Sequence, residues 1–221
     1  TLQQAGEVRF GAKVVELLTE AIDGAGEADA QARVIGVKLA DGNELYADAV
    51  VMATGHSALD ALKFAADAGA TLEAKGFAMG VRVEHPQPWL DAHQYRGKKD
   101  EAALPPAFYE LATQVNERGV YSFCMCPGGV VAPCATEQEE VVTNGWSPSK
   151  RDQATANSGI VVELRLEDFA PYAKHGPLAG VEFQAAIERK AWELAGKTQK
   201  VPMQRMTDVA QGKVSQDLPK T

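Results

Sequence analysis

The stretch Asp48-Ala49-Val50-Val51-Met52-Ala53-Thr54-Gly55 is the strongest local signal in this sequence. Its apolar run, which begins at residue 45, is typical of a strand buried on both faces, and the Thr-Gly pair is typical of a turn into a helix. Gly55 has no side chain to keep a ligand away from the backbone, and a helix N-terminus favours negative charge. The pattern predicts a strand over residues 45–53 and a ligand contact at Ala53, Thr54 and Gly55, although an ordinary strand-to-helix connection has the same form.

The residues around this stretch predict a small antiparallel sheet and one helix. Strand-like segments at 8–10, 13–22 and 33–39, separated by turns at 24–29 and 41–43, form the pattern of a β-meander. After Gly55, Ser57 and Asp60 have the spacing of a helix-capping box. The helix that follows presents Leu59, Leu62 and Ala66 on one face, and Gly69 can end it.

The second half of the chain mixes strands and helices without a regular alternation and without internal repeats. Its clearest helix covers residues 179–194, where apolar side chains recur at intervals of three and four. Helical composition between Pro105-Pro106 and Gly119 predicts another helix over 104–119. Strands are predicted at 77–84, which the proline-rich segment 85–88 ends, and at 120–125, 130–132, 139–143 and 160–166. The predicted fold class is therefore α+β or mixed α/β.

Charge, hydropathy and cysteine content exclude several function classes. The sequence has 22 Lys and Arg against 30 Asp and Glu, a net charge of −8, which disfavours nucleic acid and anionic membranes as partners. No apolar run approaches the roughly 20 residues of a membrane-spanning helix. The three cysteines, Cys124, Cys126 and Cys134, are odd in number and close together, which favours a reducing compartment, the cytoplasm, over a secreted disulfide framework. Because the sequence begins at Thr1 and stops without a helix cap, we expect both ends to be cuts in a longer protein.

Several motifs occur together in chain order, and the most specific of them is Tyr121-Ser122-Phe123-Cys124-Met125-Cys126-Pro127-Gly128-Gly129. The others are Ala53-Thr54-Gly55-His56-Ser57-Ala58, Lys75-Gly76-Phe77-Ala78-Met79-Gly80-Val81-Arg82-Val83-Glu84-His85-Pro86-Gln87, Asn144-Gly145-Trp146-Ser147, Arg151, Ala156-Asn157-Ser158, Phe183-Gln184 and Pro202-Met203-Gln204-Arg205. From about Val8 to the C-terminus, this set resembles a family of poorly characterised bacterial FAD-dependent dehydrogenases. The Ala-Thr-Gly segment is similar to the second FAD-contacting strand of flavoproteins with two dinucleotide-binding domains.

This resemblance implies a longer oxidoreductase that passes a hydride between a small-molecule substrate and FAD. It leaves open whether NAD(P)H reduces the flavin. Residues 1–60 would then belong to the FAD-binding domain, and residues 61–221 would form a substrate or cap domain, truncated at its C-terminus. Two glycine turns would contact the cofactor, and the second of them is expected to expose its backbone amides. The residues in these turns are Ala53, Thr54, Gly55, Pro127, Gly128 and Gly129, and those that would anchor charge are Arg82, Asn144, Arg151 and Asn157.

The sequence departs from the family pattern in one respect, since it contains no Gly-x-Gly-x-x-Gly turn between a strand and a helix. Gly24 and Gly26 do not supply that turn, because Asp29 stands at its third glycine position. We therefore expect weak or no FAD binding, and no activity, from this segment alone. An alternative from another class is a non-catalytic α+β binding module with structural glycine turns and an acidic surface that meets a protein partner.

No catalytic residue is assigned, and the weak candidates are Cys124, Cys126 and His85. Free cysteines are often simply packed, and a one-residue spacer would strain a disulfide between Cys124 and Cys126. The cysteine and histidine spacings do not match a structural zinc site, so no metal is expected. A third possibility is an iron-sulfur or zinc domain built on the three cysteines, which predicts bound metal in the purified protein. His85 could act as a base or proton relay, but a single histidine at a strand end is more typical of a structural residue.

Overall fold

The computed structural model describes residues 6–22, 32–96 and 104–218. The chain divides into two compact units, Thr1–Glu73 and Ala74–Thr221. As predicted, it is an α+β protein with several antiparallel sheets and few helices. Within the described residues, no helix is long and apolar enough to cross a membrane. Which function each unit serves, and the predicted division at residue 60 between two functional domains, stay predictions.

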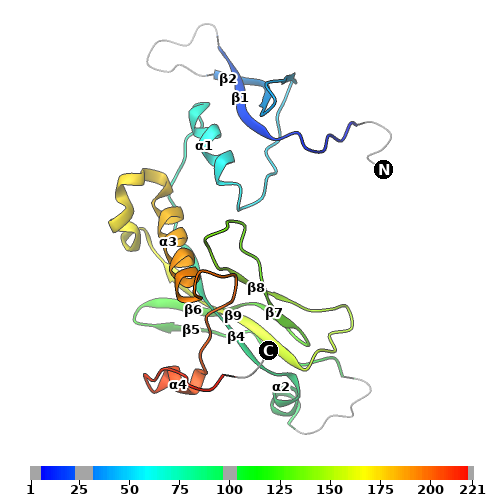
Figure 1. Cartoon of the computed structure of the whole chain (residues 1–221), viewed down its shortest axis with the longest axis vertical. Coiled ribbons are helices and arrows are strands. Elements are labelled where there is room, and N and C mark those ends of the chain that lie inside the picture. The colour runs from blue at the N-terminus through cyan, green and yellow to red at the C-terminus, as the bar shows by residue number, and fades with distance from the viewer. Residues whose placement is uncertain (1–5, 23–31, 97–103, 219–221) are drawn as a thin grey trace. The chain divides into compact units, whose positions relative to one another are not determined.

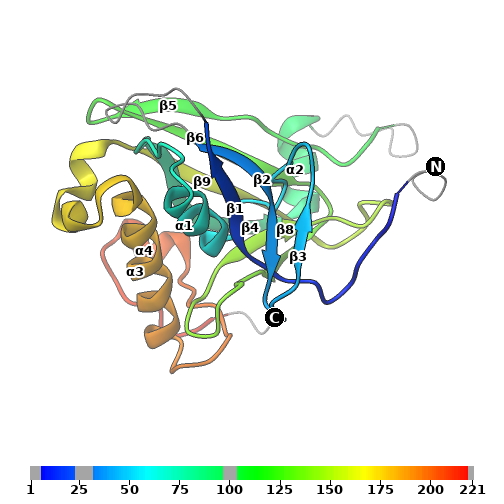
Figure 2. The same ribbon diagram turned by 90° about the horizontal axis from the view of Figure 1, so that it is seen from above.

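The first unit contains the predicted β-meander. Its strands are β1 (Val14–Ala21), β2 (Ala32–Leu39) and β3 (Glu44–Tyr46), which pair antiparallel in the order β1-β2-β3 (Figures 1 and 2). The predicted turn at 24–29 lies outside the described residues. Residues 8–10 form no strand, and Phe10 is 94% exposed there.

The predicted strand over residues 45–53 is wrong beyond its first residues. Only β3 pairs, through Glu44–Tyr46 against residues 36–38, and residues 47–58 have neither helix nor strand structure. Val51 is 87% exposed, so the apolar run is not buried among the described residues of this unit. An apolar strand needs a neighbouring strand for its backbone groups. The amide of Ala47 donates to the Ile35 carbonyl of β2 at 2.9 Å, but none of the described strands in this unit pairs with the run beyond Ala47.

The predicted helix after Gly55 is present as α1 (Leu59–Asp67), but its capping box is wrong. The N-cap residue is Ala58, and no side chain caps the helix. The Asp60 carboxylate instead accepts from the amide of Ala61 in the first turn, at 3.0 Å. Small buried side chains, Ala61 and Ala65, let α1 pack against β1.

The second unit is built on a four-stranded antiparallel sheet of order β4-β9-β6-β5, with a separate two-stranded hairpin (Figure 1). The sheet strands are β4 (Phe77–Pro86), β5 (Ala112–Val115), β6 (Arg118–Cys126) and β9 (Thr155–Leu164), and the hairpin strands are β7 (Val130–Pro133) and β8 (Thr143–Trp146). The strands predicted at 77–84, 120–125 and 130–132 are confirmed. The strand predicted at 160–166 begins earlier, as β9, and the one predicted at 139–143 lies further along the chain, as β8.

One prediction in this unit is wrong, and one helix was not predicted. The segment expected to be a helix over 104–119 contains strand β5, which pairs with β6 through a two-residue turn at Asn116 and Glu117. Both turn residues have positive φ, 49° and 63°, as this tight hairpin geometry requires. The helix α2 (Gln87–Gln94) was not predicted, because the prolines around it suggest a break. Pro88 lies in the first turn, where a missing N–H group costs no helical hydrogen bond.

The helix predicted at 179–194 is confirmed as α3 (Ala179–Leu194), and it follows a 3₁₀ segment, η2 (Leu166–Leu178). Phe169 of η2 stacks on Phe77 of β4 at 5.2 Å and contacts Phe183 of α3 at 5.4 Å, so aromatic rings join these helices to the sheet. A short helix, α4 (Met206–Ala210), lies nearer the C-terminus. A second apolar cluster, of Leu90, Ala107 and Ala156, lies beside α2.

Candidate functional site

The Cys-Met-Cys segment interrupts the pairing of β6 with β9. Phe123 pairs with Gly159, but the next pair is Cys126 with Asn157, so the register shifts between them as in a β-bulge. Cys124 has φ of 49°, a left-handed conformation that residues other than glycine rarely adopt. Its carbonyl oxygen accepts from Arg82 Nη1 at 3.1 Å. An arginine from another strand therefore stabilises the strained residue of the bulge.

Arg82 also brings together two of the other predicted charge-anchoring residues. Its Nη1 donates to Asn157 Oδ1 at 2.6 Å, and its Nη2 donates to Asn144 Oδ1 at 3.3 Å. Arg82 is half-buried, whereas Asn157 is fully buried. A side chain at Gly145 would overlap both Arg82 Nη1 and Asn157 Oδ1, so this position of β8 must be glycine for the cluster to form. We call Arg82, Asn144 and Asn157 the arginine cluster.

Arg151 does not join the arginine cluster. Its side chain is exposed and forms no hydrogen bond or ion pair with another described residue. Its backbone has φ of 51°, and its carbonyl oxygen lies where a Cβ at Gly128 would be. The contribution of Arg151 in this structure is therefore its backbone, which packs against the turn at residues 127–129.

The turn at residues 127–129 was expected to expose its amides, and this expectation is wrong. All three residues are buried. The amide of Gly128 donates to Gln87 Oε1 at 2.7 Å, and the amide of Gly129 donates to the Thr155 carbonyl at 2.8 Å. Since both N–H groups have partners within the chain, the turn offers neither of them to a ligand. The role of Gln87 was missed, although Gln87 ends one of the motifs that the sequence singles out.

The Thr-Gly turn of the first unit, in contrast to the buried turn at residues 127–129, is exposed to solvent. Ala53, Thr54 and Gly55 are exposed, and Gly55 has φ of 79° with open space where a Cβ would lie. None of the backbone N–H groups of residues 48–58 donates a hydrogen bond to another described residue. Because α1 begins four residues later and its first turn has no side-chain cap, free amide groups are concentrated here.

The weak catalytic candidates lie in different surroundings. Cys126 is buried, whereas Cys124 is exposed, and both are free thiols. His85 is half-buried, with Nε2 3.0 Å from the hydroxyl of Tyr109, and burial lowers its pKa from the ordinary value. Burial also raises the pKa of Tyr109, so both groups favour their neutral forms. In the part of the chain that the structure describes, no group of three or more His, Cys, Asp or Glu side chains could hold a metal ion.

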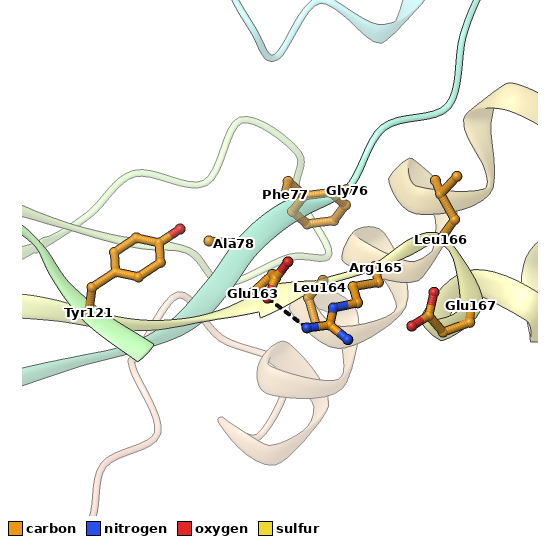
Figure 3. A pocket seen from close by; sticks show the side chains of 9 residues that line it. All are labelled: Gly76, Phe77, Ala78, Tyr121, Glu163, Leu164, Arg165, Leu166 and Glu167. Carbon is orange, nitrogen blue, oxygen red and sulfur yellow. Dashed lines mark hydrogen bonds and ion pairs between the residues drawn. The ribbon is translucent and has the colours of Figure 1, made fainter. Parts of the chain in front are cut away.

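The second unit also has an open groove of about 500 Å³, shown in Figure 3. Two of its charged side chains pair with each other, because Arg165 Nη2 donates to Glu163 at 3.2 Å. The same nitrogen donates to the backbone carbonyl of Glu117 at 2.6 Å. The hydrogen bond from Arg165 lowers the pKa of the Glu163 carboxyl. The groove is lined by Gly76, Phe77, Ala78, Tyr121, Glu163, Leu164, Arg165, Leu166 and Glu167, none of which was a predicted site residue. None of these lining residues has a buried polar side-chain atom without a partner among the described residues, whereas Nδ2 of Asn157 in the arginine cluster is such an atom. The groove is therefore a weaker candidate for ligand binding than the arginine cluster.

Comparison with known proteins identifies the family of this chain. Residues 76–221 match the family described as "FAD-dependent protein, C-terminal domain-like". The chain belongs to this family. It is also 38% identical, over 215 residues, to an uncharacterized protein of Clostridium beijerinckii. That alignment covers 96% of the present chain but only 38% of the relative, so the chain spans well under half of the relative's length.

Membership of this FAD-dependent family raises the question of which residues suit the cofactor. FAD carries an anionic pyrophosphate, and free backbone amides near a helix N-terminus suit such a group. The turn at residues 53–55 meets that requirement. The turn at residues 127–129 does not, because its two amides are bonded internally. Within the described residues, the structural fit to FAD therefore rests on the first unit.

Proposed function

We propose that this segment works within a longer FAD-dependent oxidoreductase. The observation that carries the proposal is the match of residues 76–221 to an FAD-dependent family. The similarity to a relative of which this chain covers only 38% supports the view that further residues complete the enzyme. Such residues would supply the Gly-x-Gly-x-x-Gly turn that this sequence lacks.

Ala53, Thr54 and Gly55 are the residues that would hold FAD. Their exposure and free backbone amides support a contact with an anionic part of the cofactor. When bound, the flavin supplies the capacity to accept or donate a hydride. Since Gly55 has positive φ and open space around it, the chain can bring its backbone against a ligand there.

The second unit would serve as the substrate domain. Its buried turn at residues 127–129 joins β6, α2 and β9 through the hydrogen bonds of Gly128 and Gly129, and so fixes the bulge that adjoins the arginine cluster. The substrate would be a small molecule, with NAD(P)H as a candidate electron donor. No side chain is assigned to proton transfer. Cys126 lies beside the arginine cluster but is buried, and Cys124 contacts Arg82 through its backbone carbonyl. His85 is instead hydrogen-bonded to Tyr109.

The test compares the 221-residue segment with the longer protein that contains it. Both are purified, and their visible absorbance is recorded before and after FAD is added. We expect the longer protein to be yellow as isolated and the segment to bind little FAD. If the longer protein is colourless and takes up no FAD, the proposal is wrong, and the non-catalytic binding module becomes the better account of the fold.

A further inference from the structure

The arginine cluster contains a positive charge that no acidic side chain in the described part of the chain neutralises. Arg82 donates only to neutral carbonyl oxygens, those of Cys124, Asn144 and Asn157. Among the described residues, no aspartate or glutamate forms an ion pair with it. A guanidinium that is partly removed from water is stabilised far more by an anion than by neutral oxygens. The residues that the structure describes therefore leave this charge without an anionic partner.

Some N–H donors of the Arg82 guanidinium have no acceptor among the described residues. It carries five N–H groups, of which both on Nη1 and one on Nη2 are bonded. The N–H of Nε and one N–H of Nη2 remain without a partner among the described residues. Nε and Nη2 share one edge of the guanidinium, and a carboxylate can accept two parallel hydrogen bonds from such an edge.

Asn157 supplies an independent indication of a missing partner. This residue is 0% exposed, and its Nδ2 has no hydrogen-bond partner within residues 6–22, 32–96 and 104–218. Because Oδ1 accepts from Arg82, the amide is oriented with Nδ2 as a donor that needs an acceptor. A buried amide donor without a partner is unfavourable and rare in folded proteins, so an acceptor is expected beside it.

These two observations name the ligand chemistry. We propose that Arg82 and Asn157 together bind the carboxylate of a small organic acid. A phosphate dianion would be expected to draw on more donors, but the nearby glycine amides are already used: Gly145 donates to Asn144 Oδ1 at 2.8 Å, and Gly128 and Gly129 also have internal acceptors. One positive charge and a few free N–H groups match a singly charged, planar carboxylate. That this carboxylate belongs to the oxidoreductase's substrate rests on the proposed function.

The test uses benzoate as the anionic probe, benzamide as its neutral counterpart and phenyl phosphate as the phosphate probe. Each is titrated into the whole 221-residue chain without FAD, and binding is followed by calorimetry and by the side-chain amide signal of Asn157 in ¹H–¹⁵N spectra. We expect benzoate to bind, to shift that signal, and to bind at least tenfold more tightly than either benzamide or phenyl phosphate. The wild-type spectrum needs no variant, so it remains informative if a variant unfolds.

Three variants locate the site. Arg82→Gln is expected to weaken benzoate binding roughly ten- to a hundredfold, because it removes a charge-assisted pair of hydrogen bonds. Asn157→Asp places a carboxylate of the same shape beside Arg82, so it is expected to abolish benzoate binding by occupying the site. Arg189→Gln, which changes an exposed arginine of α3, is the matched control and should leave benzoate affinity unchanged.

Three results would overturn the proposal. These are equal affinity for benzoate and benzamide, tighter binding of phenyl phosphate than of benzoate, and unchanged benzoate affinity in a folded Arg82→Gln chain. Because every titration is made without FAD, failure of the longer protein to bind flavin would leave these results unaffected. Failure of benzoate to bind would also overturn the carboxylate proposal, and it would leave the test of flavin binding unaffected.

Discussion

The two glycine turns of this protein look alike in sequence and differ in structure. Both follow apolar or alternating segments, and both contain a glycine with positive φ, Gly55 at 79° and Gly128 at 51°. The first turn is exposed, and its amides have no acceptor among the described residues. The second is buried, with both glycine amides bonded to acceptors in α2 and β9. A glycine turn can thus be a ligand contact or a structural joint, and its hydrogen-bond partners decide which.

The most direct way to test this difference is to add a methyl group to the buried turn. In Gly128→Ala, the new Cβ would overlap the carbonyl oxygen of Arg151, in a backbone conformation that alanine avoids. We expect the second unit to lose on the order of 4 kcal/mol of stability. All 3 tryptophans, Trp89, Trp146 and Trp192, lie in this unit, so urea unfolding followed by tryptophan fluorescence reports on it alone. An unchanged urea midpoint would mean that the turn is not packed as described.

The hydrogen bonds of the buried turn can be tested from the other side, at Gln87. Gln87→Leu leaves the Gly128 amide and the Ala107 carbonyl without their side-chain partner, and we expect a loss of about 2–4 kcal/mol in the free energy of unfolding. Gln94→Leu on the same helix is the control, because the hydrogen bond from its side chain to the Phe108 carbonyl, at 3.3 Å, is exposed. Equal effects of the two substitutions, measured by the same urea titration, would contradict the account.

How far the sequence predicts this structure depends on whether local pattern or distant pairing controls each segment. Helix α3 and strands β1, β2 and β4 follow from periodicity, and their expected bounds are close to the observed ones. The segment at 104–119 has helical composition, but pairing with β6 makes part of it a strand. Pairing partners far away in sequence are not visible in local composition, so this error could not be avoided from pattern alone.

The candidate site also shows that sequence motifs predict some features and that the fold determines others. The sequence singled out Arg82, Asn144 and Asn157 through motifs, and the structure brings them together. It also singled out Arg151 and the amides of Gly128 and Gly129, whose surroundings depend on α2 and β9. Motifs identify residue types suited to binding, whereas burial and hydrogen-bond partners are set by the fold.

The exposed turn should tolerate a glycine-to-alanine substitution better than the buried turn does. Gly55→Ala meets no atom within 4 Å, so its cost comes only from a left-handed backbone and should be about 1–2 kcal/mol. Hydrogen exchange of α1 and β1 measures the stability of the first unit. A loss as large as that of Gly128→Ala would show that the Thr-Gly turn is packed, and the comparison between the two turns would fail.

The smallest expected effect is a pH dependence from His85, which lies two residues before Gln87. Burial lowers the pKa of His85 in the folded state, so the unfolded chain binds a proton more readily. The second unit should therefore lose some stability as pH falls from about 7 through the folded-state pKa. His85→Gln should remove that part of the pH dependence, while His175→Gln, at an exposed position, should retain it. Urea midpoints at neutral and mildly acidic pH give the comparison, and identical pH profiles for His85→Gln and wild type would contradict it.

The most direct test of the central claim is the flavin content of the longer protein carrying Gly55→Val. Gly42→Val is the matched control, since Gly42 also lies in the first unit with positive φ, 89°, and open space around it. If residues 53–55 contact FAD, the Gly55 variant should lose most of its flavin absorbance while the Gly42 variant keeps it. Full flavin content in a folded Gly55→Val protein would contradict the assignment of this turn to the cofactor.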